Sequence, residues 1–344
     1  MQCSQYDIYH TVEYHLAAQD QGLGDPALLV VEESSEIFAL PLLVRSPDEI
    51  IGGKNKRDAT SVYGYGGPIT SLQSIPLDRQ IWSKNVGGGL LKLMQQLGLV
   101  SCFTRLHPLI DSAWVIDSIG KINVVGPTVI IDLSKAEEEQ QKEMRSNYRR
   151  VVRKMTRQGV QVIADPEWSQ LDQFILAYEE TMARVSASNT YFYDQQYFSS
   201  LRDRLNKNVR LFHAVLNDQI IGSSIFFTCN NIIQYHLGAT FSAFTSHSPN
   251  AMILDFVRCW GMDAGMKWFH LGGGVEGKDD SVFRFKSGLS EHRREYFSAA
   301  IIVDQPEYDR LCTRRRRLNS SKEDIADPGS FFPEYRLPLP TPDS

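Results

Sequence analysis

Hydrophobic and polar positions alternate along this chain in two series that repeat in the same order. Residues 27–45, ALLVVEESSEIFALPLLVR, hold two apolar runs separated by a polar turn, and residues 209–228 hold two more. Both stretches have the pattern of paired strands and predict hairpins. A helical apolar pattern follows each hairpin, at 90–98 and at 252–265, and ends at a glycine before another strand-like run. The shared order favours a duplicated α/β unit over chance agreement of common elements.

The clearest helical pattern lies between the two halves, at residues 134–158. Ser134 and Glu137 form a capping-box pattern at its start, and Gly159 follows its end. Residues 142–157 hold seven positive side chains and one negative, which is more than the helix dipole requires. Two neighbouring rows carry this charge: Arg145, Arg149 and Arg153 in one, and Arg150, Lys154 and Arg157 in the other. The pattern suits a solvated face and a phosphate-contacting face equally well.

Composition narrows the class of protein. The chain has 344 residues, 42% hydrophobic and 22% charged, as expected for a soluble globular protein of about two domains. Its net charge is −5, so any anion-binding site must be a local feature. Scattered cysteines and isolated histidines predict free thiols and no metal site. No apolar run reaches the ~18 residues of a membrane helix, and the N-terminus has no signal-peptide pattern. We therefore expect a cytoplasmic protein without a membrane span. We take it to be a monomer, although nothing in the sequence specifies the oligomeric state.

The stretch HLGGGVEGKDDSVFRFKSGLS, residues 270–290, partly fits two nucleotide-binding patterns. Its glycines satisfy G-x-G-x-x-G and, with Lys278, most of a P-loop. Asp279 stands where a P-loop needs Ser or Thr, and too few residues follow for the strand–helix units of either fold. Both nucleotide interpretations are disfavoured. The alternation in SVFRFKSGLS places Arg284 and Lys286 on one side of any extended segment.

Five segments together resemble the Fem-type branch of the GNAT acyltransferase superfamily. They occur in the family's order between about residues 61 and 336: SVYGYGGPI, SCFTRLHPL, SNYRRVVRK, HLGGGVEGKDDSVFRFKSGLS and FFPEYR. The resemblance implies an α/β (α+β) fold of two tandem GNAT-like domains. Each is expected to have a mixed, mostly antiparallel sheet flanked by helices, and the two are expected to face each other across a cleft. We place the N-terminal domain at 1–125, the C-terminal domain at 126–312, and a flexible or surface-wrapping tail, rich in proline and charge, at 313–344.

The best-known members of this family transfer an amino acid from aminoacyl-tRNA to an amine of a peptidoglycan precursor, and other relatives use other acceptors. The resemblance therefore implies a transferase that joins an activated aminoacyl or acyl group to an amine through an amide bond. Aminoacyl-tRNA is the expected co-substrate, with no tightly bound cofactor. The expected acceptor bears an amine, and phosphate-containing cell-wall precursors and small metabolites both fit.

Two alternatives to this function remain. One is an N-acyltransferase that uses acyl-CoA, and the other is a non-catalytic GNAT-like binding module. CoA-dependent relatives have a Q/R-x-x-G-x-G/A loop whose backbone N–H groups hold the pyrophosphate at a helix start. Residues 238–252 have only Gly238 before the helix start at Ser248 and Pro249, which disfavours CoA.

Amide formation from an ester needs a donor directed at the oxyanion of the tetrahedral state. Lys286 is our candidate, and it coincides with the lysine that the resembling family places at the reaction centre. A surface ion pair with Asp279 or Asp280 is the alternative interpretation. The expected substrate-binding residues are Arg149, Arg150 and Arg153 for phosphate, Tyr63, Tyr65 and Tyr235 lining the cleft, Arg105 and His107 on the resemblance, and Asp280 and Arg284 beside the lysine.

Overall fold

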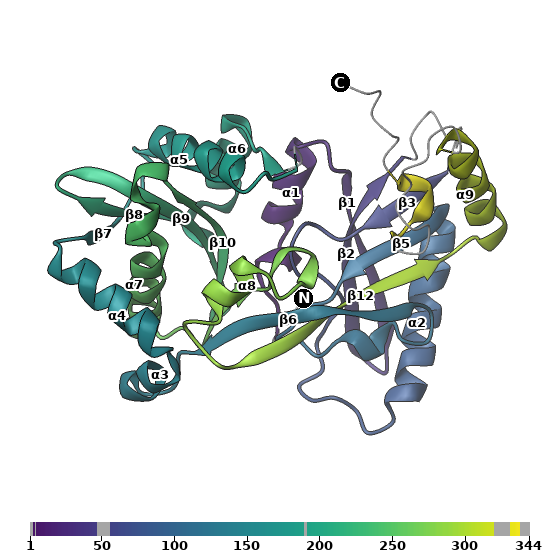
Figure 1. Cartoon of the computed structure of the whole chain (residues 1–344). Coiled ribbons are helices and arrows are strands. Elements are labelled where there is room, and N and C mark those ends of the chain that lie inside the picture. The colour runs from purple at the N-terminus through teal and green to yellow at the C-terminus, as the bar shows by residue number, and fades with distance from the viewer. Residues whose placement is uncertain (1–2, 4, 47–55, 189–190, 320–330, 338–344) are drawn as a thin grey trace. The chain divides into compact units, whose positions relative to one another are not determined.

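The computed structural model describes residues 3, 5–46, 56–188, 191–319 and 331–337 of the chain. The chain folds into two compact units (Figure 1). Unit 1 comprises Met1–Val125 and Tyr296–Ser344, and unit 2 comprises Gly126–Glu295. The chain passes into unit 2 within strand β6 (Lys121–Asp132) and returns within β12 (Arg293–Ile302).

Unit 1 is a mostly antiparallel sheet with helices packed against it. Its strands lie in the order β1-β2-β3-β5-β12, with β4 paired to β2, and β3 and β5 run parallel. Apolar side chains of the sheet, such as Phe38 and Leu42, meet Val86 and Leu90 of α2 in one core. The elements are α1 (Val12–Asp20), β1 (Asp25–Glu33), β2 (Glu36–Arg45), β3 (Arg57–Thr60), β4 (Ile69–Thr70), α2 (Arg79–Gln96), β5 (Leu99–Arg105) and α9 (Gln305–Asn319).

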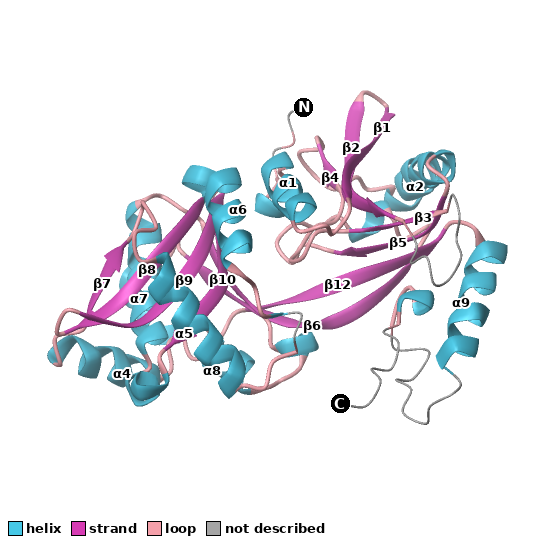
Figure 2. Ribbon diagram, turned by 90° about the horizontal axis from the view of Figure 1, so that it is seen from above, coloured by secondary structure: helices cyan, strands magenta, loops and turns pink. Residues whose placement is uncertain are grey.

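The strands of unit 2 run in the order β6-β11-β10-β9-β8-β7, in a mixed arrangement with helices on both faces (Figure 2). Phe226 of β9 joins the core formed with α4 and α7. The next residue, Phe227, points to the other face of the sheet and packs on His236. His236 in turn contacts Tyr197 of α6. The elements are α3 (Glu137–Glu143), α4 (Ser146–Arg157), β7 (Gln161–Ala164), α5 (Leu171–Arg184), α6 (Gln195–Leu205), β8 (Val209–Leu216), β9 (Gln219–Cys229), β10 (Ile232–Thr240), α7 (Pro249–Asp263), β11 (Trp268–Gly272) and α8 (Ser281–Lys286).

The predicted mixed α/β architecture is confirmed, and so are both hairpins, β1–β2 and β8–β9. After each hairpin come a strand, a helix and a second strand parallel to the first: β3, α2 and β5 in unit 1, where the short β4 lies between β3 and α2, and β10, α7 and β11 in unit 2. Gly98 and Gly265 follow α2 and α7 with φ of +67° and +70°, values that glycine adopts without strain.

The three tyrosines expected to line the cleft lie at different kinds of position in the two units. Tyr63 and Tyr65 lie in the loop after β3, whereas Tyr235 lies inside β10. These tyrosines therefore do not occupy equivalent positions.

The single helix expected at 134–158 is two helices, α3 and α4, separated at Met144 and Arg145. Met144 is buried in the core, and the Arg145 N–H donates to Gly288 O at 3.0 Å, so a tertiary contact takes the place of a helical hydrogen bond at this break. The capping box is also absent, since Ser134 Oγ donates to Asp132 Oδ1 at 2.5 Å instead of capping a helix. Gly159 ends α4 with φ of +83°, as predicted.

The C-terminal boundary and the tail also differ from expectation. Residues 296–312, expected in the C-terminal domain, belong to unit 1, because β12 pairs with β5 from Ser298 to Ile302. The expected tail begins inside α9, and Tyr335 is fully buried. Residues 320–330 and 338–344 of the expected tail lie outside the described residues.

Candidate active site

The parallel strands β10 and β11 of unit 2 pair over only three positions, from Ile232 and Trp268 to Gln234 and His270. Directly afterwards β10 bulges between Tyr235 and Leu237, and β11 shifts its register with β6. Ligands in open α/β sheets bind beyond the carboxyl ends of parallel strands where neighbours separate. The end of this pairing is therefore the place to look for chemistry in unit 2.

Lys286 lies at this place. It is the last residue of α8, so the segment SVFRFK is helical rather than extended as expected. Its Nζ donates to Gly273 O, just past the end of β11, at 2.6 Å, and lies 5.8 Å from the centre of the Tyr235 ring of β10. The ammonium group thus lies between Tyr235 of β10 and Gly273, the residue that follows β11. An ammonium has three N–H donors, and Gly273 O uses one of them.

The surroundings of Lys286 set its charge. Burial lowers the pKa of Lys286 to about 8, while the Asp280 carboxylate acts in the opposite direction. The group is therefore mostly protonated at neutral pH. Burial also raises the pKa of Tyr235 to about 12, so its phenol stays neutral beside the ammonium. A partly desolvated cation with free donors can stabilise a developing negative charge more strongly than one in water.

Asp280 and Arg284, both expected to bind substrate, have other partners in the structure. The Asp280 carboxylate accepts from Phe283 N at 2.8 Å and from Val275 N at 2.9 Å. Arg284 is exposed and pairs with Asp279 at 3.1 Å. Neither acid forms an ion pair with Lys286, so the alternative interpretation of the lysine as half of a surface pair is wrong.

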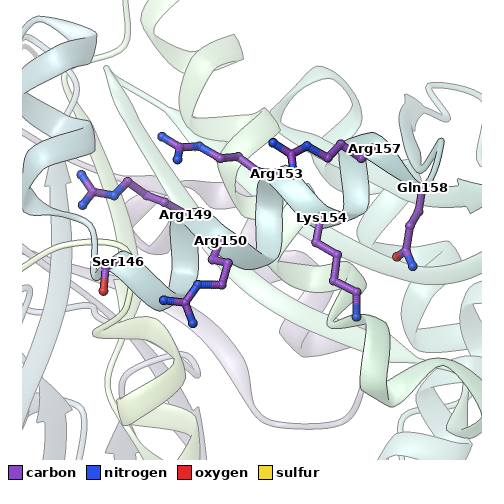
Figure 3. A pocket seen from close by; sticks show the side chains of 7 residues that line it. All are labelled: Ser146, Arg149, Arg150, Arg153, Lys154, Arg157 and Gln158. Atoms are coloured by element: carbon purple, nitrogen blue, oxygen red, sulfur yellow. The ribbon is translucent and has the colours of Figure 1, made fainter.

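The basic face of α4 forms a groove of about 570 Å³ (Figure 3). Arg149 donates to Gln141 O at 2.7 Å. Four more basic side chains line the groove: Arg150, Arg153, Lys154 and Arg157. No carboxylate of the described residues forms an ion pair with any of them. The lining residues are Ser146, Arg149, Arg150, Arg153, Lys154, Arg157 and Gln158. An unneutralised row of this kind attracts a polyanion.

The first turn of α4 packs on the segment that carries Lys286. Tyr148 contacts Phe285 with ring centres 6.2 Å apart. A Cβ at Gly288 would lie 2.9 Å from the Tyr148 ring, so only glycine allows this approach. The basic helix and Lys286 therefore belong to one packed part of unit 2.

The remaining expected site residues lie in unit 1. Tyr63 is exposed, with the Arg105 guanidinium 5.8 Å from its ring centre. Tyr65 packs edge-on against Tyr296 at 5.2 Å. His107 is buried and pairs with the buried Asp7 at 2.9 Å, which indicates a structural role for this histidine. Tyr63, Tyr65 and Arg105 keep contact with solvent, whereas His107 does not.

The start of α7 differs from the glycine loop that precedes this helix in CoA-dependent relatives. The helix begins at Pro249 as predicted, but Ser248 has φ of +50° and makes no side-chain cap. A Cβ at Gly238 would lie 1.9 Å from Tyr235 Oη, so the tyrosine hydroxyl fills the space beside this glycine. Asn250 Nδ2 donates to Thr240 Oγ1 at 3.3 Å. A side chain therefore lies at the start of this helix, where CoA-dependent relatives have glycines that expose backbone N–H groups.

Sequence reasoning missed Gly273, whose carbonyl holds the lysine, because a backbone acceptor leaves no signal in residue type.

In the described part of the chain there is no group of three His, Cys, Asp or Glu side chains able to hold a metal ion. None of the described helices is long and apolar enough to cross a lipid bilayer.

Comparison with known proteins identifies one domain and a shared fold. Residues 142–287, less than half of the chain, match the family described as "Acetyltransferase (GNAT) domain". This range runs from the end of α3 to the residue after Lys286. No curated protein sequence matches the chain.

Solved structures match over most of the chain. FemX has a TM-score of 0.68 and 13% identity over 89% of this chain and 95% of its own. L-PGS from Bacillus licheniformis has a TM-score of 0.52 and 14% identity, covering 88% and 95%. The C-terminal domain of a provisionally assigned lysylphosphatidylglycerol synthetase from Agrobacterium fabrum has a TM-score of 0.53 and 10% identity, covering 86% and 88%. The TM-scores show that these proteins share a fold with this chain. At sequence identities this low, the similarity shows the fold alone.

Proposed function

We propose that this protein, an acyltransferase with a GNAT domain and a Fem-like fold, moves an aminoacyl group from aminoacyl-tRNA to an acceptor amine. The observation that carries the proposal is the Lys286 ammonium, partly desolvated and held between Gly273 O and the Tyr235 ring. A cation held in this way suits the oxyanion that forms when an amine attacks an ester.

In the proposed reaction the acceptor nitrogen attacks the ester carbonyl of the aminoacyl group and forms a C–N bond. The carbonyl oxygen becomes an oxyanion, and Lys286 stabilises it with an N–H that Gly273 does not use. Collapse of the tetrahedral state breaks the C–O bond to the terminal ribose. The released ribose oxygen gains a proton, and the amine nitrogen loses one to water or to the substrate. No dedicated base of the protein is required.

The groove on α4 supports RNA as the carrier of the aminoacyl group. Arg150 and Arg153 line this groove with positive charge that suits phosphate, and their helix packs on the Lys286 segment. The filled space at Gly238 argues against acyl-CoA, the second candidate donor. The Agrobacterium fabrum relative is assigned as a lysylphosphatidylglycerol synthetase. The product in that name carries an aminoacyl group, which agrees with aminoacyl transfer. A peptidoglycan precursor and a small metabolite both suit the acceptor role.

The double variant Arg150→Ala/Arg153→Ala is expected to bind bulk aminoacylated tRNA more weakly than the unmodified protein. Each lost phosphate contact removes about 0.7–0.9 from the slope of log K against log salt, so the slope is expected to become shallower by about 1–2. Binding is measured at several salt concentrations. Arg202→Ala is the control, because Arg202 lies on α6 and pairs with Asp203. An unchanged slope in the double variant would make this face of α4 a solvated surface.

The rate of transfer is expected to fall as the pH rises through about 8. The pKa of Lys286 lies near 8 because of burial, so the stabilising positive charge is present below that pH and is lost above it. Hydroxylamine serves as the acceptor with aminoacyl-tRNA as donor, since hydroxylamine is neutral across this range. The uncatalysed reaction is measured and subtracted. An enzyme-dependent rate that keeps rising to about pH 10 would exclude a charged Lys286 from the mechanism.

A further inference from the structure

The Asp280 carboxylate joins two pieces of backbone that together locate Lys286. One oxygen accepts from Phe283 N at 2.8 Å and caps α8, the helix that ends at Lys286. The other accepts from Val275 N at 2.9 Å, in the loop that begins with Gly273. Gly273 in turn supplies the carbonyl that holds the lysine. The Asp280 side chain therefore connects the start of α8 to the loop whose Gly273 carbonyl accepts from the Lys286 ammonium.

The loop held by Asp280 has little freedom to move toward its surroundings. A Cβ at Gly274 would lie 2.1 Å from Lys278 O, and a Cβ at Gly273 would lie 2.9 Å from Pro127 O. Gly126 of β6 is equally close, since its Cβ would lie 2.2 Å from Gly277 O. Close backbone packing fixes the loop against β6 on one side, and Asp280 fixes it to α8 on the other.

We propose that Asp280 is a positioning residue of the candidate active site, which fixes the Lys286 ammonium relative to Gly273 O and supplies the negative charge nearest to it. This inference rests on the proposed role of Lys286. It reassigns Asp280 from the substrate-binding role that the sequence suggested, because each carboxylate oxygen accepts from a backbone N–H beside the lysine.

The charged and titratable groups around the lysine are few in the described chain. Asp280 is its acidic neighbour, and Tyr235 faces it from β10. Tyr148 of α4 packs on the same segment, and burial raises its pKa well above the ordinary value, so it is neutral. Burial alone would raise the pKa of Asp280, but hydrogen bonds from backbone N–H groups, including those of Phe283 and Val275, outweigh burial and lower the pKa. The carboxylate is therefore ionised at neutral pH.

The test measures the pKa of Lys286 directly, without any assay of function. The purified full-length protein is treated with trace acetic anhydride at a series of pH values, and acetylation of Lys286 is quantified by mass spectrometry. Asp280→Asn keeps a residue that caps helices well but removes the charge. Asp279→Asn is the matched control, because Asp279 carries the same charge one residue away and pairs with the exposed Arg284.

In Asp280→Asn the midpoint for acetylation of Lys286 is expected to move to lower pH, with the rate at neutral pH roughly threefold higher or more, as a pKa lower by about half a unit requires. Asp279→Asn is expected to match the unmodified protein. The proposal is overturned if Asp280→Asn leaves the midpoint unchanged, or if both variants shift it equally. These results stand whether or not the protein uses aminoacyl-tRNA.

Discussion

Lys286→Met is expected to lower the rate constant for aminoacyl transfer by about 10²–10³, the loss typical of removing one oxyanion donor. Methionine keeps the length and apolar stem of the side chain but has neither charge nor N–H donor. The hydrogen bond to Gly273 O and the contact with the Tyr235 ring are both lost. Single-turnover transfer from aminoacyl-tRNA to hydroxylamine measures the effect.

The free energy of unfolding of Lys286→Met is not expected to fall, because burial disfavours the charged lysine and lowers its pKa. Binding of aminoacyl-tRNA is expected to survive as well, since the phosphate-contacting groove lies on α4. Lys278→Met is the control: Lys278 is highly exposed and pairs with Glu276 at 2.6 Å. If Lys286→Met transferred at the unmodified rate, Lys286 would have no part in the chemistry.

Asp58→Ala is expected to lower the free energy of unfolding by about 3 kcal/mol, the low end of the range for breaking a buried ion pair. Asp58 is fully buried in unit 1 and pairs with Arg45 at 2.9 Å and with Arg336 through two contacts. Tyr335 donates its hydroxyl to the same carboxylate at 3.1 Å. Alanine would leave these groups without their shared acceptor. The low end applies because both arginines keep some exposure.

Urea denaturation measures the change, and Asp78→Ala is the control, because Asp78 is exposed and makes no side-chain cap to α2. The control is expected to stay within about 0.5 kcal/mol of the unmodified protein, as is usual for surface substitutions. Equal stabilities of Asp58→Ala and Asp78→Ala would show that the C-terminal segment is not anchored by this carboxylate.

The parts of the fold that sequence predicts well are those specified by local pattern. Alternating apolar runs located the hairpins, and glycines located the ends of α2, α4 and α7. The break between α3 and α4 could not be predicted in the same way. The apolar stripe continues through Met144, and the bond from Arg145 N to Gly288 O joins residues far apart in sequence. The anchoring of Tyr335 beneath Asp58 depends on equally distant contacts.

The candidate site shows the same division. Lys286 was identified from its segment and the family resemblance, although the segment is a helix whose start depends on Asp280. The roles of Gly273 and Asp280 were not predictable, because they depend on a backbone carbonyl and on backbone N–H groups. His107 was expected to bind substrate, but its buried pairing with Asp7 requires a contact between residues 100 positions apart in the chain.

The most direct test of the proposed function is equilibrium binding of the purified protein to aminoacylated tRNA, uncharged tRNA and acetyl-CoA, side by side at two salt concentrations. We expect the tightest binding to aminoacylated tRNA, weakening as salt rises because the α4 groove contacts phosphate. Binding to acetyl-CoA together with indifference to both forms of tRNA would contradict the proposal and identify a conventional N-acyltransferase on this two-unit fold.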